Sequence, residues 1–308
     1  MNPLLVVGSA NVDYVLRVPR FPAPGETLAA SSLRTFPGGK GANQAAAAAL
    51  AGAPTTLCAA IGQDASGEFL MTQLSARGVD LSLLTRVPTE TGTAVIYVDD
   101  TGENQIVIAA GANGVLDPAF VRETVAESHA DFILVQLEVS QVVVRSCLLD
   151  GKKVILNPAP FRPIPGEILS QLFLITPNET EFAGLTGSDA SSIQGLRQGA
   201  GFLREKGVNQ VIVTLGARGC FWTDGVNELL VEAPQVQPVD TTGAGDAFNG
   251  ALAAELASEK AIEEALRFAV AAASLSATQP GAMASFRSRE EVENLMRSAL
   301  NSSDQALR

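Results

Sequence analysis

One acidic residue stands directly behind a glycine-rich loop, where the sequence predicts the start of a helix. Asp246 follows Gly243-Ala244-Gly245 in this segment. Backbone N–H groups of such a loop can converge on an anion, and the helix dipole strengthens the attraction. A carboxylate beside that anion can accept a proton from a hydroxyl that attacks a phosphoryl group. The segment therefore indicates phosphoryl transfer, and the alternative is a glycine turn with an acidic helix cap.

A second glycine-rich segment, 36–44, precedes a run of alanines. Its adjacent glycines, which include Gly39, let the backbone approach a small ligand closely, and Lys40 and Asn43 offer hydrogen bonds to hydroxyl groups. The segment does not contain the GxxxxGK[ST] pattern of a P-loop. Residues 8–11 likewise do not form the GxGxxG pattern of a dinucleotide-binding fold, so both of these nucleotide-binding classes are disfavoured.

Polar side chains also follow two of the expected strands. Asn11 and Asp13 come just after the apolar run 4–7, and Glu138 follows the run 132–136. Open α/β sheets bind ligands outside the carboxyl ends of their strands, where these residues would lie. An amide and a carboxylate two residues apart suit a pair of sugar hydroxyls. The alternatives are an Asx turn at Asn11 and Asp13, and a surface acid at Glu138.

Two further segments follow expected strands nearer the C-terminus. Asn178 and Glu181 are three residues apart, so on a helix they would share a face and could hold phosphate oxygens or Mg²⁺-bound water. Thr214 stands at the end of another apolar run, and Gly216 and Gly219 after it would allow a nucleotide to lie against the backbone. Each signal is weak alone, and its recurrence at successive strand ends is what favours a nucleotide site.

These segments need a scaffold that brings distant parts of the chain to one edge. Short apolar runs predict buried strands at 4–7, 56–61, 132–136, 153–156, 172–176 and 210–214. Helices are predicted at 45–51, 67–77, 200–206 and 261–273. Continuous apolar strands that alternate with helices form mainly parallel sheets covered on both faces. The sequence therefore predicts an α/β fold.

A smaller sheet is predicted from less apolar segments. Residues 12–18 alternate apolar and polar side chains, and 93–98 and 104–108 read as a hairpin. Together with 28–36, these strands would form a lid over the main domain. We therefore predict a discontinuous organisation, with an α/β domain at 1–11, 37–90 and 111–308 and a β lid at 12–36 and 91–110.

Composition narrows the classes of function. The 308 residues are 46% hydrophobic and 18% charged, which suits a large buried core, and the net charge of −12 disfavours nucleic acid and membranes as partners. Neither a signal peptide nor a membrane span is expected. Cys58, Cys147 and Cys220 are far apart and form no CxxC pair, so we expect free thiols and a cytoplasmic location. His129, the only histidine, is expected at a helix end on the surface, not in a triad or zinc site.

Five motifs occur in order along the chain: GGKGAN at 38–43, NPAP at 157–160, TPNETE at 176–181, TLGARG at 214–219 and DTTGAGD at 240–246. With this combination the sequence resembles the ribokinase family of sugar and nucleoside kinases, from Leu4 to about Phe286. The resemblance implies a ribokinase-like three-layer sandwich with a mainly parallel central sheet and a small β-sheet lid. It also implies ATP-dependent phosphorylation of D-ribose at the 5-hydroxyl, to give ribose 5-phosphate and ADP.

The resemblance further implies residue roles. Asp246 would be the base for the ribose 5-hydroxyl, next to an anion hole formed by the amides of Gly243, Ala244 and Gly245. The implied sugar-binding positions are Asn11, Asp13, Gly39, Lys40, Asn43 and Glu138. The implied nucleotide positions are Asn178, Thr214, Gly216, Gly219 and Gly245, and Glu181 belongs to the motif that organises Mg²⁺ and phosphate. K⁺, as a monovalent cation, is implied at Asp240, Thr242, Ser276, Gln279, Gly281 and Ser285. A homodimer through the lid sheet is also implied.

Two departures from the family pattern stand out. Val270 replaces a residue that is polar near the adenine in many relatives, so apolar contact would hold the base. Only residues 139–152 separate Glu138 from the next strand, which predicts a shortened peripheral helix. The alternatives are a sibling kinase for 2-deoxyribose, fructose, a nucleoside or another sugar, and a catalytically silent sugar sensor. The complete GAGD segment disfavours the sensor, and the missing glycine fingerprint disfavours a nucleotide-binding oxidoreductase.

Overall fold

Two β-sheets form the framework of the computed structural model, which describes residues 2–306. The larger sheet has nine strands in the order β13-β12-β11-β10-β9-β8-β1-β4-β5. Neighbouring strands are parallel except at β11–β12 and β12–β13, which are antiparallel. The strands are β1 (Leu4–Val7), β4 (Thr55–Gly62), β5 (Leu84–Val87), β8 (Phe132–Gln136), β9 (Lys153–Asn157), β10 (Leu174–Ile175), β11 (Gln210–Thr214), β12 (Cys220–Thr223) and β13 (Glu228–Val231).

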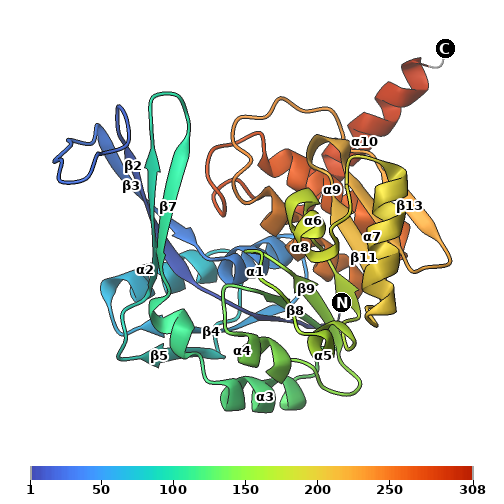
Figure 1. Ribbon diagram of the computed structural model, residues 1–308, viewed down its shortest axis with the longest axis horizontal. Helices are drawn as coiled ribbons and strands as arrows, with labels where there is room; N and C mark the ends of the chain where they lie inside the picture. Colours follow the sequence, from blue (N-terminus) through green and yellow to red (C-terminus); the bar gives the residue numbers. More distant parts are fainter. Residues whose placement is uncertain (1, 307–308) are drawn as a thin grey trace.

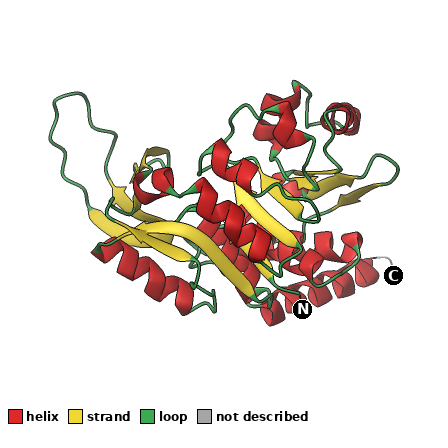
Figure 2. Cartoon of the chain, turned by 90° about the horizontal axis from the view of Figure 1, so that it is seen from below, coloured by secondary structure: helices red, strands yellow, loops and turns green. Residues whose placement is uncertain are grey.

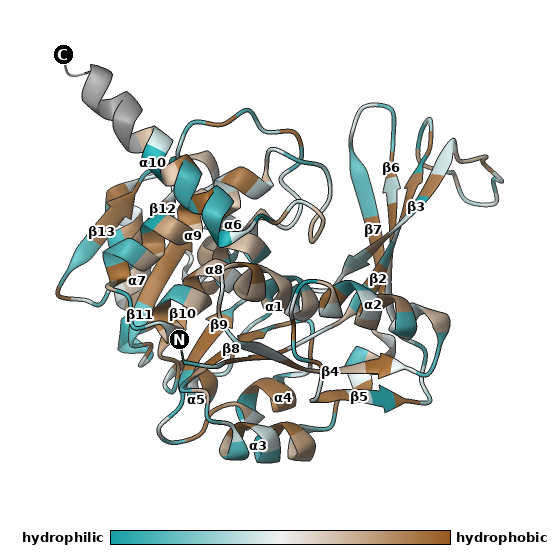
Figure 3. Cartoon of the chain, turned by 180° about the vertical axis from the view of Figure 1, so that it is seen from behind, coloured by the Kyte–Doolittle hydropathy of each residue, from teal (hydrophilic) through white to brown (hydrophobic). Residues whose placement is uncertain are grey.

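The central strands are buried on both faces, because their side chains alternate between two hydrophobic cores. In β1, Leu4 and Val6 pack in one core and Leu5 and Val7 in the other. The first core is covered by α1 (Lys40–Leu50), α2 (Ala65–Ser75), α8 (Ala244–Ala257), α9 (Ile262–Ser276) and α10 (Arg289–Ala306). The second is covered by η1 (Gly111–Val115), α3 (Pro118–Glu127), α4 (Gln141–Ser146), α5 (Gly166–Leu169), α6 (Glu179–Thr186) and α7 (Ile193–Glu205). The helices flank the sheet in Figure 2, and hydrophobic residues colour its central strands in Figure 3, which confirms the predicted three-layer α/β fold.

The order of the strands reverses at β1, which lies between β4 and β8. Such a switch point leaves a crevice outside the carboxyl ends of the strands, and ligands of open α/β sheets bind there. Residues 8–11 follow β1, and residues 137–138 follow β8. The polar residues that the sequence placed after these two strands therefore meet at one edge of the sheet.

The smaller sheet stands out from the main body like a lid (Figure 1). Its four strands have the order β3-β2-β6-β7. They are β2 (Asn11–Arg17), β3 (Ser32–Gly38), β6 (Gly92–Val98) and β7 (Asn104–Ala109). The predicted hairpin of β6 and β7 is present, and β2 pairs in parallel with β6 and antiparallel with β3.

Two side chains anchor the base of this lid sheet to the main body. Asp64, the N-cap of α2, accepts hydrogen bonds from the Thr91 amide at 2.8 Å and the Thr91 hydroxyl at 2.6 Å, just before β6. Asn113 Nδ2 donates to Asn11 Oδ1 at 2.7 Å at the start of β2. The two central strands of the lid therefore leave the main body from fixed points.

Helices α1 and α8 pack closely enough to place their N-terminal turns side by side. Gly250 makes this possible, because an added Cβ would lie only 2.4 Å from the Gln44 carbonyl oxygen and 2.6 Å from the Ala47 Cβ. The alanines of α1 and α8 are almost all buried at this contact. Small side chains thus bring the GGKGAN and GAGD segments together.

The first turn of α1 corrects one prediction, since the helix begins at Lys40 and not at Ala45. Partners from neighbouring strand ends satisfy the amides of this turn. The Lys40 amide donates to Glu138 Oε2 at 2.9 Å, and the Gly41 amide donates to Ser9 Oγ at 3.3 Å. Half of the predicted glycine loop is therefore helical, because tertiary contacts cap it.

Several other predicted elements have different bounds, and three of the differences have an identifiable cause. Strand β3 starts at Ser32 and not at residue 28, because β2 ends where Arg17 pairs with Ser32. Strand β10 is only Leu174–Ile175, since the next carbonyl, that of Thr176, accepts the Asn157 side chain at 3.1 Å. Helix α7 starts at Ile193 and not at residue 200. Its first part contains Gly195 and Gly199, and glycine has a low helix propensity, so the sequence did not predict it as helical.

The short crossover after Glu138 contains only the six-residue helix α4, as predicted. His129 is exposed just after α3, also as predicted. All three cysteines are buried and free. Among residues 2–306, no helix combines the length and apolar character needed to cross a bilayer.

Candidate active site

Asp246 lies in the first turn of α8, as the sequence predicted, and is only 7% exposed. The N-cap is Gly243, whose φ of 79° is a left-handed conformation that glycine adopts without strain. An added Cβ at Gly243 would lie 2.8 Å from Ala282, so a side chain would also separate this loop from the segment after α9. The glycine loop thus turns sharply into the helix and leaves Asp246 facing α1.

The Asp246 carboxylate receives two hydrogen bonds from α1. Asn43 Nδ2 donates to Oδ2 at 2.9 Å, and Gln44 Nε2 donates to Oδ1 at 2.9 Å. Burial raises the pKa of Asp246 above its ordinary value, although the Lys40 ammonium and both hydrogen bonds act in the opposite direction. Glu138 adds to the increase. The result is a carboxylate of increased basicity that is held on both oxygens.

The three amides of the predicted anion hole differ in their hydrogen bonds. The Ala244 amide donates to the Thr241 carbonyl at 3.1 Å and so closes a turn. Within residues 2–306, the amides of Gly243 and Gly245 donate to no protein acceptor. Two of the three amides therefore have no acceptor among the described residues, and the anion hole itself stays a prediction.

Lys40, Gly39 and Glu138 lie together at the start of α1. Gly39 has a φ of 84°, and an added Cβ would lie 2.7 Å from the Asn11 amide nitrogen, so only glycine allows this approach. Glu138 Oε2 accepts the Lys40 amide at 2.9 Å and the Ser9 hydroxyl at 2.5 Å. The predicted sugar-binding residues of the main domain thus surround one helix start.

Asn11 and Asp13 approach the same place from β2. Asn11 is buried, and its Oδ1 is occupied by Asn113, which leaves the Nδ2 group of Asn11 without a hydrogen bond among the described residues. The Asp13 carboxylate packs against Gly38 of the paired strand, where an added Cβ would lie 2.2 Å from Oδ2. Gly38 therefore leaves the space that this carboxylate occupies.

One cation, the ammonium group of Lys40, faces several carboxylates in this region. Burial alone would lower the pKa of Lys40, but the carboxylates of Asp246, Glu138, Glu181 and Asp13 raise it above its ordinary value. Burial, together with Glu138 and Asp246, raises the pKa of Asp13 to about 7, and Lys40 opposes this shift. Lys40 thus compensates a cluster of carboxylates that would otherwise repel one another.

Asn43 carries a buried acceptor that nothing satisfies. Its Nδ2 donates to Asp246, while its Oδ1 is buried and has no hydrogen-bond partner in the part of the chain that the structure describes. A buried acceptor without a partner destabilises the folded state, so such an atom in a binding site usually accepts a hydrogen bond from a ligand or water. Asn43 Oδ1 can accept a hydrogen bond from a hydroxyl group that lies next to the Asp246 carboxylate.

The predicted nucleotide residues line a separate cavity of about 500 Å³. Its walls include Asn178, Thr214, Gly216 and Gly219, and it extends to Gly245, directly before Asp246. The remaining lining is largely apolar and includes Phe248 and Val270, with backbone from η2 (Gly216–Arg218). The structure therefore connects this cavity to the carboxylate through the glycine loop.

Asn178 and Glu181 also have a structural role that the sequence analysis did not assign. Asn178 is the N-cap of α6 and its Oδ1 accepts the Glu181 amide at 2.8 Å, while Glu181 Oε2 accepts the Asn178 amide at 2.9 Å. This capping box uses one oxygen of each side chain. The other groups, Asn178 Nδ2 and Glu181 Oε1, have no hydrogen bond among the described residues, so both side chains can still contact a ligand.

The predicted cation-binding residues lie on the loop before α8 and on the segment from the end of α9 to Ser285, and these two parts are in contact. Asp240 Oδ1 accepts the Thr242 amide at 2.9 Å, and Oδ2 accepts the Gly281 amide at 2.8 Å. Burial tends to raise the pKa of Asp240, but the Thr242 side chain and the two amides hold it below the ordinary value. The Ser276 hydroxyl donates to the Ala273 carbonyl at 2.8 Å, and that of Ser285 donates to Ala282 at 2.8 Å. The ionised Asp240 thus ties the GAGD loop to the segment that contains Gln279 and Gly281.

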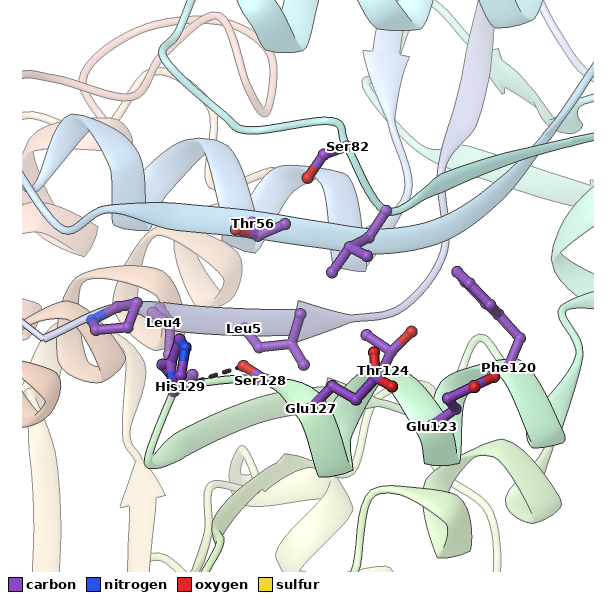
Figure 4. Close-up of a pocket in the computed structure, with 13 residues that line it drawn as sticks. Leu4, Leu5, Thr56, Ser82, Phe120, Glu123, Thr124, Glu127, Ser128 and His129 are labelled. Carbon is purple, nitrogen blue, oxygen red and sulfur yellow. Dashed lines mark hydrogen bonds between the residues drawn. The ribbon is translucent and has the colours of Figure 1, made fainter.

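A second hollow, of about 320 Å³, lies at the amino end of β1 and β4, against α3 (Figure 4). Its lining includes Thr56 on β4, Thr124 and Glu127 on α3, and His129 just after α3. It contains none of the predicted site residues. The cluster of polar residues at the carboxyl ends of β1 and β8 is therefore the candidate active site.

Comparison with known proteins agrees with this arrangement. The family model described as pfkB family carbohydrate kinase matches residues 1–289. The ribokinase of Haemophilus influenzae is 39% identical over 94% of this chain and 96% of its own length. The deoxyribokinase of Salmonella typhi is 35% identical over 94% of this chain and 96% of its own. The solved structure of Arabidopsis thaliana ribokinase, in complex with ribose and ATP, matches with a TM-score of 0.88 and 36% identity over 96% of this chain and 98% of that one.

The match extends over nearly the whole chain, and the relatives are covered almost completely. It includes every segment of the candidate site, from Asn11 to Ser285. The chain belongs to the pfkB family of carbohydrate kinases.

Proposed function

We propose that this protein transfers the γ-phosphoryl group of ATP to the 5-hydroxyl of D-ribose and releases ribose 5-phosphate and ADP. The observation that carries the proposal is the position of Asp246. Its carboxylate accepts a hydrogen bond from Asn43, one of the proposed sugar-binding residues. The preceding residue, Gly245, lines the nucleotide cavity. The similarity to the ribokinase of Haemophilus influenzae, and to the Arabidopsis thaliana ribokinase in complex with ribose and ATP, supports the choice of both substrates.

The chain supplies a base, a cation and an anion hole for this reaction. As the O5 atom of ribose forms its bond to the γ-phosphorus, its proton passes to the Asp246 carboxylate, and the bond from that phosphorus to the β-phosphate oxygen breaks. The increased basicity of the buried Asp246 favours the proton transfer. The free amides of Gly243 and Gly245 would stabilise the negative charge of the transferring group.

Ribose recognition would fall to the polar groups that the protein itself leaves unsatisfied. Asn43 Oδ1 and Asn11 Nδ2 offer an acceptor and a donor, and the Asp13 and Glu138 carboxylates accept hydroxyls. Lys40 and the buried backbone at Gly39 would complete this set. An oriented set of this kind discriminates between sugars that differ by a single hydroxyl, because a missing hydroxyl leaves a buried group unpaired.

The nucleotide would bind in the 500 Å³ cavity, with its base against Val270 and its phosphates toward Gly245. The available oxygen atoms fit the Mg²⁺ that accompanies ATP. Burial raises the pKa of Glu181, against the hydrogen bond from the Asn178 amide and the charge of Lys40, and its Oε1 has no hydrogen bond among the described residues. We infer that Glu181, with Asn178, would hold Mg²⁺ or its bound water. When bound, Mg²⁺ neutralises charge on the phosphate oxygens.

We further infer a monovalent cation, K⁺, at Asp240, Thr242, Ser276, Gln279, Gly281 and Ser285. The ionised Asp240, with both oxygens on backbone amides, supports this inference because it fixes two loops rich in carbonyl groups. An ion there would order the anion hole without contacting substrate. Initial rates in potassium should exceed those in sodium or tetramethylammonium at equal ionic strength, and equal rates in all three salts would exclude the site.

We also assign residues 12–36 and 91–110 to a lid that pairs with a second copy of the chain. Four large apolar side chains of this sheet are more than half exposed: Leu33, Ile106, Val107 and Ile108. Sedimentation should give a dimer that Ile106→Arg converts to a monomer, and a wild-type monomer would refute the pairing. The free, buried cysteines support a cytoplasmic location.

A substrate panel tests the main proposal. ATP consumption should be measured with ribose, 2-deoxyribose, fructose and nucleosides, each with product identification. If Asn11 and Asp13 read the ribose hydroxyls, kcat/KM for ribose should exceed that for 2-deoxyribose by about ten-fold or more. Equal efficiency on both sugars would favour the deoxyribokinase alternative, and the absence of turnover with every sugar would favour a sensor.

A further inference from the structure

A chain of buried amides lies against Asp246, and the proposed reaction does not use it. Gln136 Nε2 donates to Gln44 Oε1 at 2.7 Å. Gln44 Nε2 in turn donates to Asn157 Oδ1 at 3.0 Å and to Asp246 Oδ1 at 2.9 Å. Asn157 Nδ2 donates to the Thr176 backbone carbonyl at 3.1 Å. Gln44 and Gln136 are fully buried, and Asn157 is 6% exposed.

The direction of every bond in this chain follows from its last member. A backbone carbonyl can only accept, so the Nδ2 group of Asn157 must face Thr176 and its Oδ1 must face Gln44. The Nε2 group of Gln44 must therefore face Asn157, and the same group reaches Asp246. The amide of Gln44 cannot be reversed without placing two acceptors against each other at both positions.

Gln136 shows that this orientation is kept at a cost. Its Oε1 is buried and has no hydrogen-bond partner among the described residues. Reversing the Gln136 amide would turn that oxygen toward Gln44 Oε1 and remove the donor that fixes Gln44. The row of amides thus leaves Gln136 Oε1 without a partner but keeps the Gln44 donor directed at the Asp246 carboxylate.

We propose that Gln44 is a positioning residue, which holds one oxygen of the Asp246 carboxylate in place and favours its ionised form. Gln136 and Asn157 act through Gln44 by fixing the orientation of its amide. The inference rests on the proposed role of Asp246 as the base. It adds a requirement that the motif residues alone do not state, namely a donor on α1 whose orientation is fixed by residues at the ends of β8 and β9 and directly after β10.

The charged groups around Asp246 explain why such a donor matters. Lys40 on α1 favours the ionised carboxylate, whereas Asp13 on β2, Glu138 after β8 and Glu181 on α6 disfavour it. A neutral donor stabilises the anion without adding a charge that would hold the transferred phosphoryl group. The loss of Gln44 would therefore leave Lys40 and Asn43 to oppose burial and three like charges.

The test is the pH dependence of kcat/KM in Gln44→Met, which removes the donor but keeps an unbranched side chain of similar length. A hydrogen bond to a charged group is worth about one pK unit or more, so the acidic limb should move upward by about one pH unit. Activity at high pH should fall less than activity at low pH. Titration of ATP is common to all variants and cancels in the comparison.

Two further variants separate positioning from general disruption. Gln136→Met removes the orienting donor and should shift the acidic limb in the same direction, which also serves if Gln44→Met does not fold. Thr176→Val changes an equally buried neighbour but keeps the carbonyl that anchors Asn157, so its acidic limb should match that of the wild type. An unmoved limb in Gln44→Met, or an equal shift in Thr176→Val, would overturn the inference.

A second measurement does not depend on activity, and so distinguishes failure of this inference from failure of the proposed function. Burial raises the pKa of Asp246, so above that pKa the charged carboxylate destabilises the folded state relative to the unfolded chain. Asp246→Asn should therefore raise the melting temperature at pH 8, and by a larger amount in the Gln44→Met background than in the wild type. Equal increases in both backgrounds would show that Gln44 does not stabilise the charge, whatever the substrate.

Discussion

Replacing Gly38 by alanine should separate sugar binding from stability, because the added Cβ would collide with the Asp13 carboxylate. It would lie 2.2 Å from Oδ2 and 2.4 Å from both Oδ1 and Cγ, whereas an ordinary contact begins at 3.4 Å. The carboxylate must therefore move by about 1 Å, a misplacement that can cost about 10²-fold in rate. Gly38 is not among the residues with positive φ, so the backbone itself accepts alanine.

The assay compares three quantities in Gly38→Ala and wild type. We expect kcat/KM for ribose to fall by about 10²-fold. The affinity for ADP should not change, because Gly38 does not line the nucleotide cavity. The free energy of unfolding should fall by less than about 1.5 kcal/mol, the scale of one strained rotamer.

Gly201→Ala is the matched control, since an added Cβ there has no atom within 4 Å and the residue lies inside α7. It should leave the kinetics unchanged. Near wild-type kcat/KM in Gly38→Ala would refute the assignment of Asp13 to the sugar. A loss of stability in proportion to the loss of activity would refute the separation.

Three further predictions concern single side chains. Asp246→Asn should lower kcat by at least about 10²-fold while calorimetry still detects both substrates, and near wild-type turnover would place the base elsewhere. The pKa of Asp13 is raised from 3.8 to about 7, so the folded state binds more protons across this window and loses stability as the pH rises. Asp13→Asn should therefore flatten the dependence of melting temperature on pH between these values, and an unchanged slope would contradict the shift. Arg289 pairs with the buried Glu255, so Arg289→Met should cost about 3 kcal/mol in urea unfolding without changing kcat, and Glu255→Gln in the same chain should restore part of the loss.

The parts of the site that the sequence predicted are those with local signals. Asp246 could be placed at a helix start because glycines precede it, and Asn11 and Glu138 could be placed at strand ends because apolar runs end just before them. In each case the signal lies within a few residues. The fold class followed for the same reason, since strands buried on both faces are continuous apolar runs.

The parts that could not be predicted depend on contacts between distant residues. Gln44 meets Gln136, Asn157 and Asp246, which are 92, 113 and 202 residues away in the chain. No periodicity marks such a partner, so Gln44 reads as one more polar residue beside a run of alanines. The hydrogen bond from Asn113 to Asn11 could not be predicted for the same reason.

Asn178 and Glu181 show a different limit. The spacing of an asparagine and a glutamate three residues later is that of a capping box as well as that of a phosphate-binding motif. The structure contains the capping box, with Asn178 as the N-cap of α6. One pattern can thus serve both the local helix and the ligand, and only the atoms left without partners distinguish the two roles.

The anchored base of the lid has a mechanical consequence for the sugar-binding strand. Strand β2 leaves the main body at Asn11, which Asn113 holds, so this point acts as the pivot of a lever. At about 3.3 Å per residue, Asp13 lies about 7 Å from the pivot and Arg17 about 20 Å. A rotation of about 10° would then move Arg17 by about 3.5 Å but Asp13 by only about 1 Å. A rotation of the lid about this point would therefore move its far end most, while the Asp13 carboxylate would stay close to its present position.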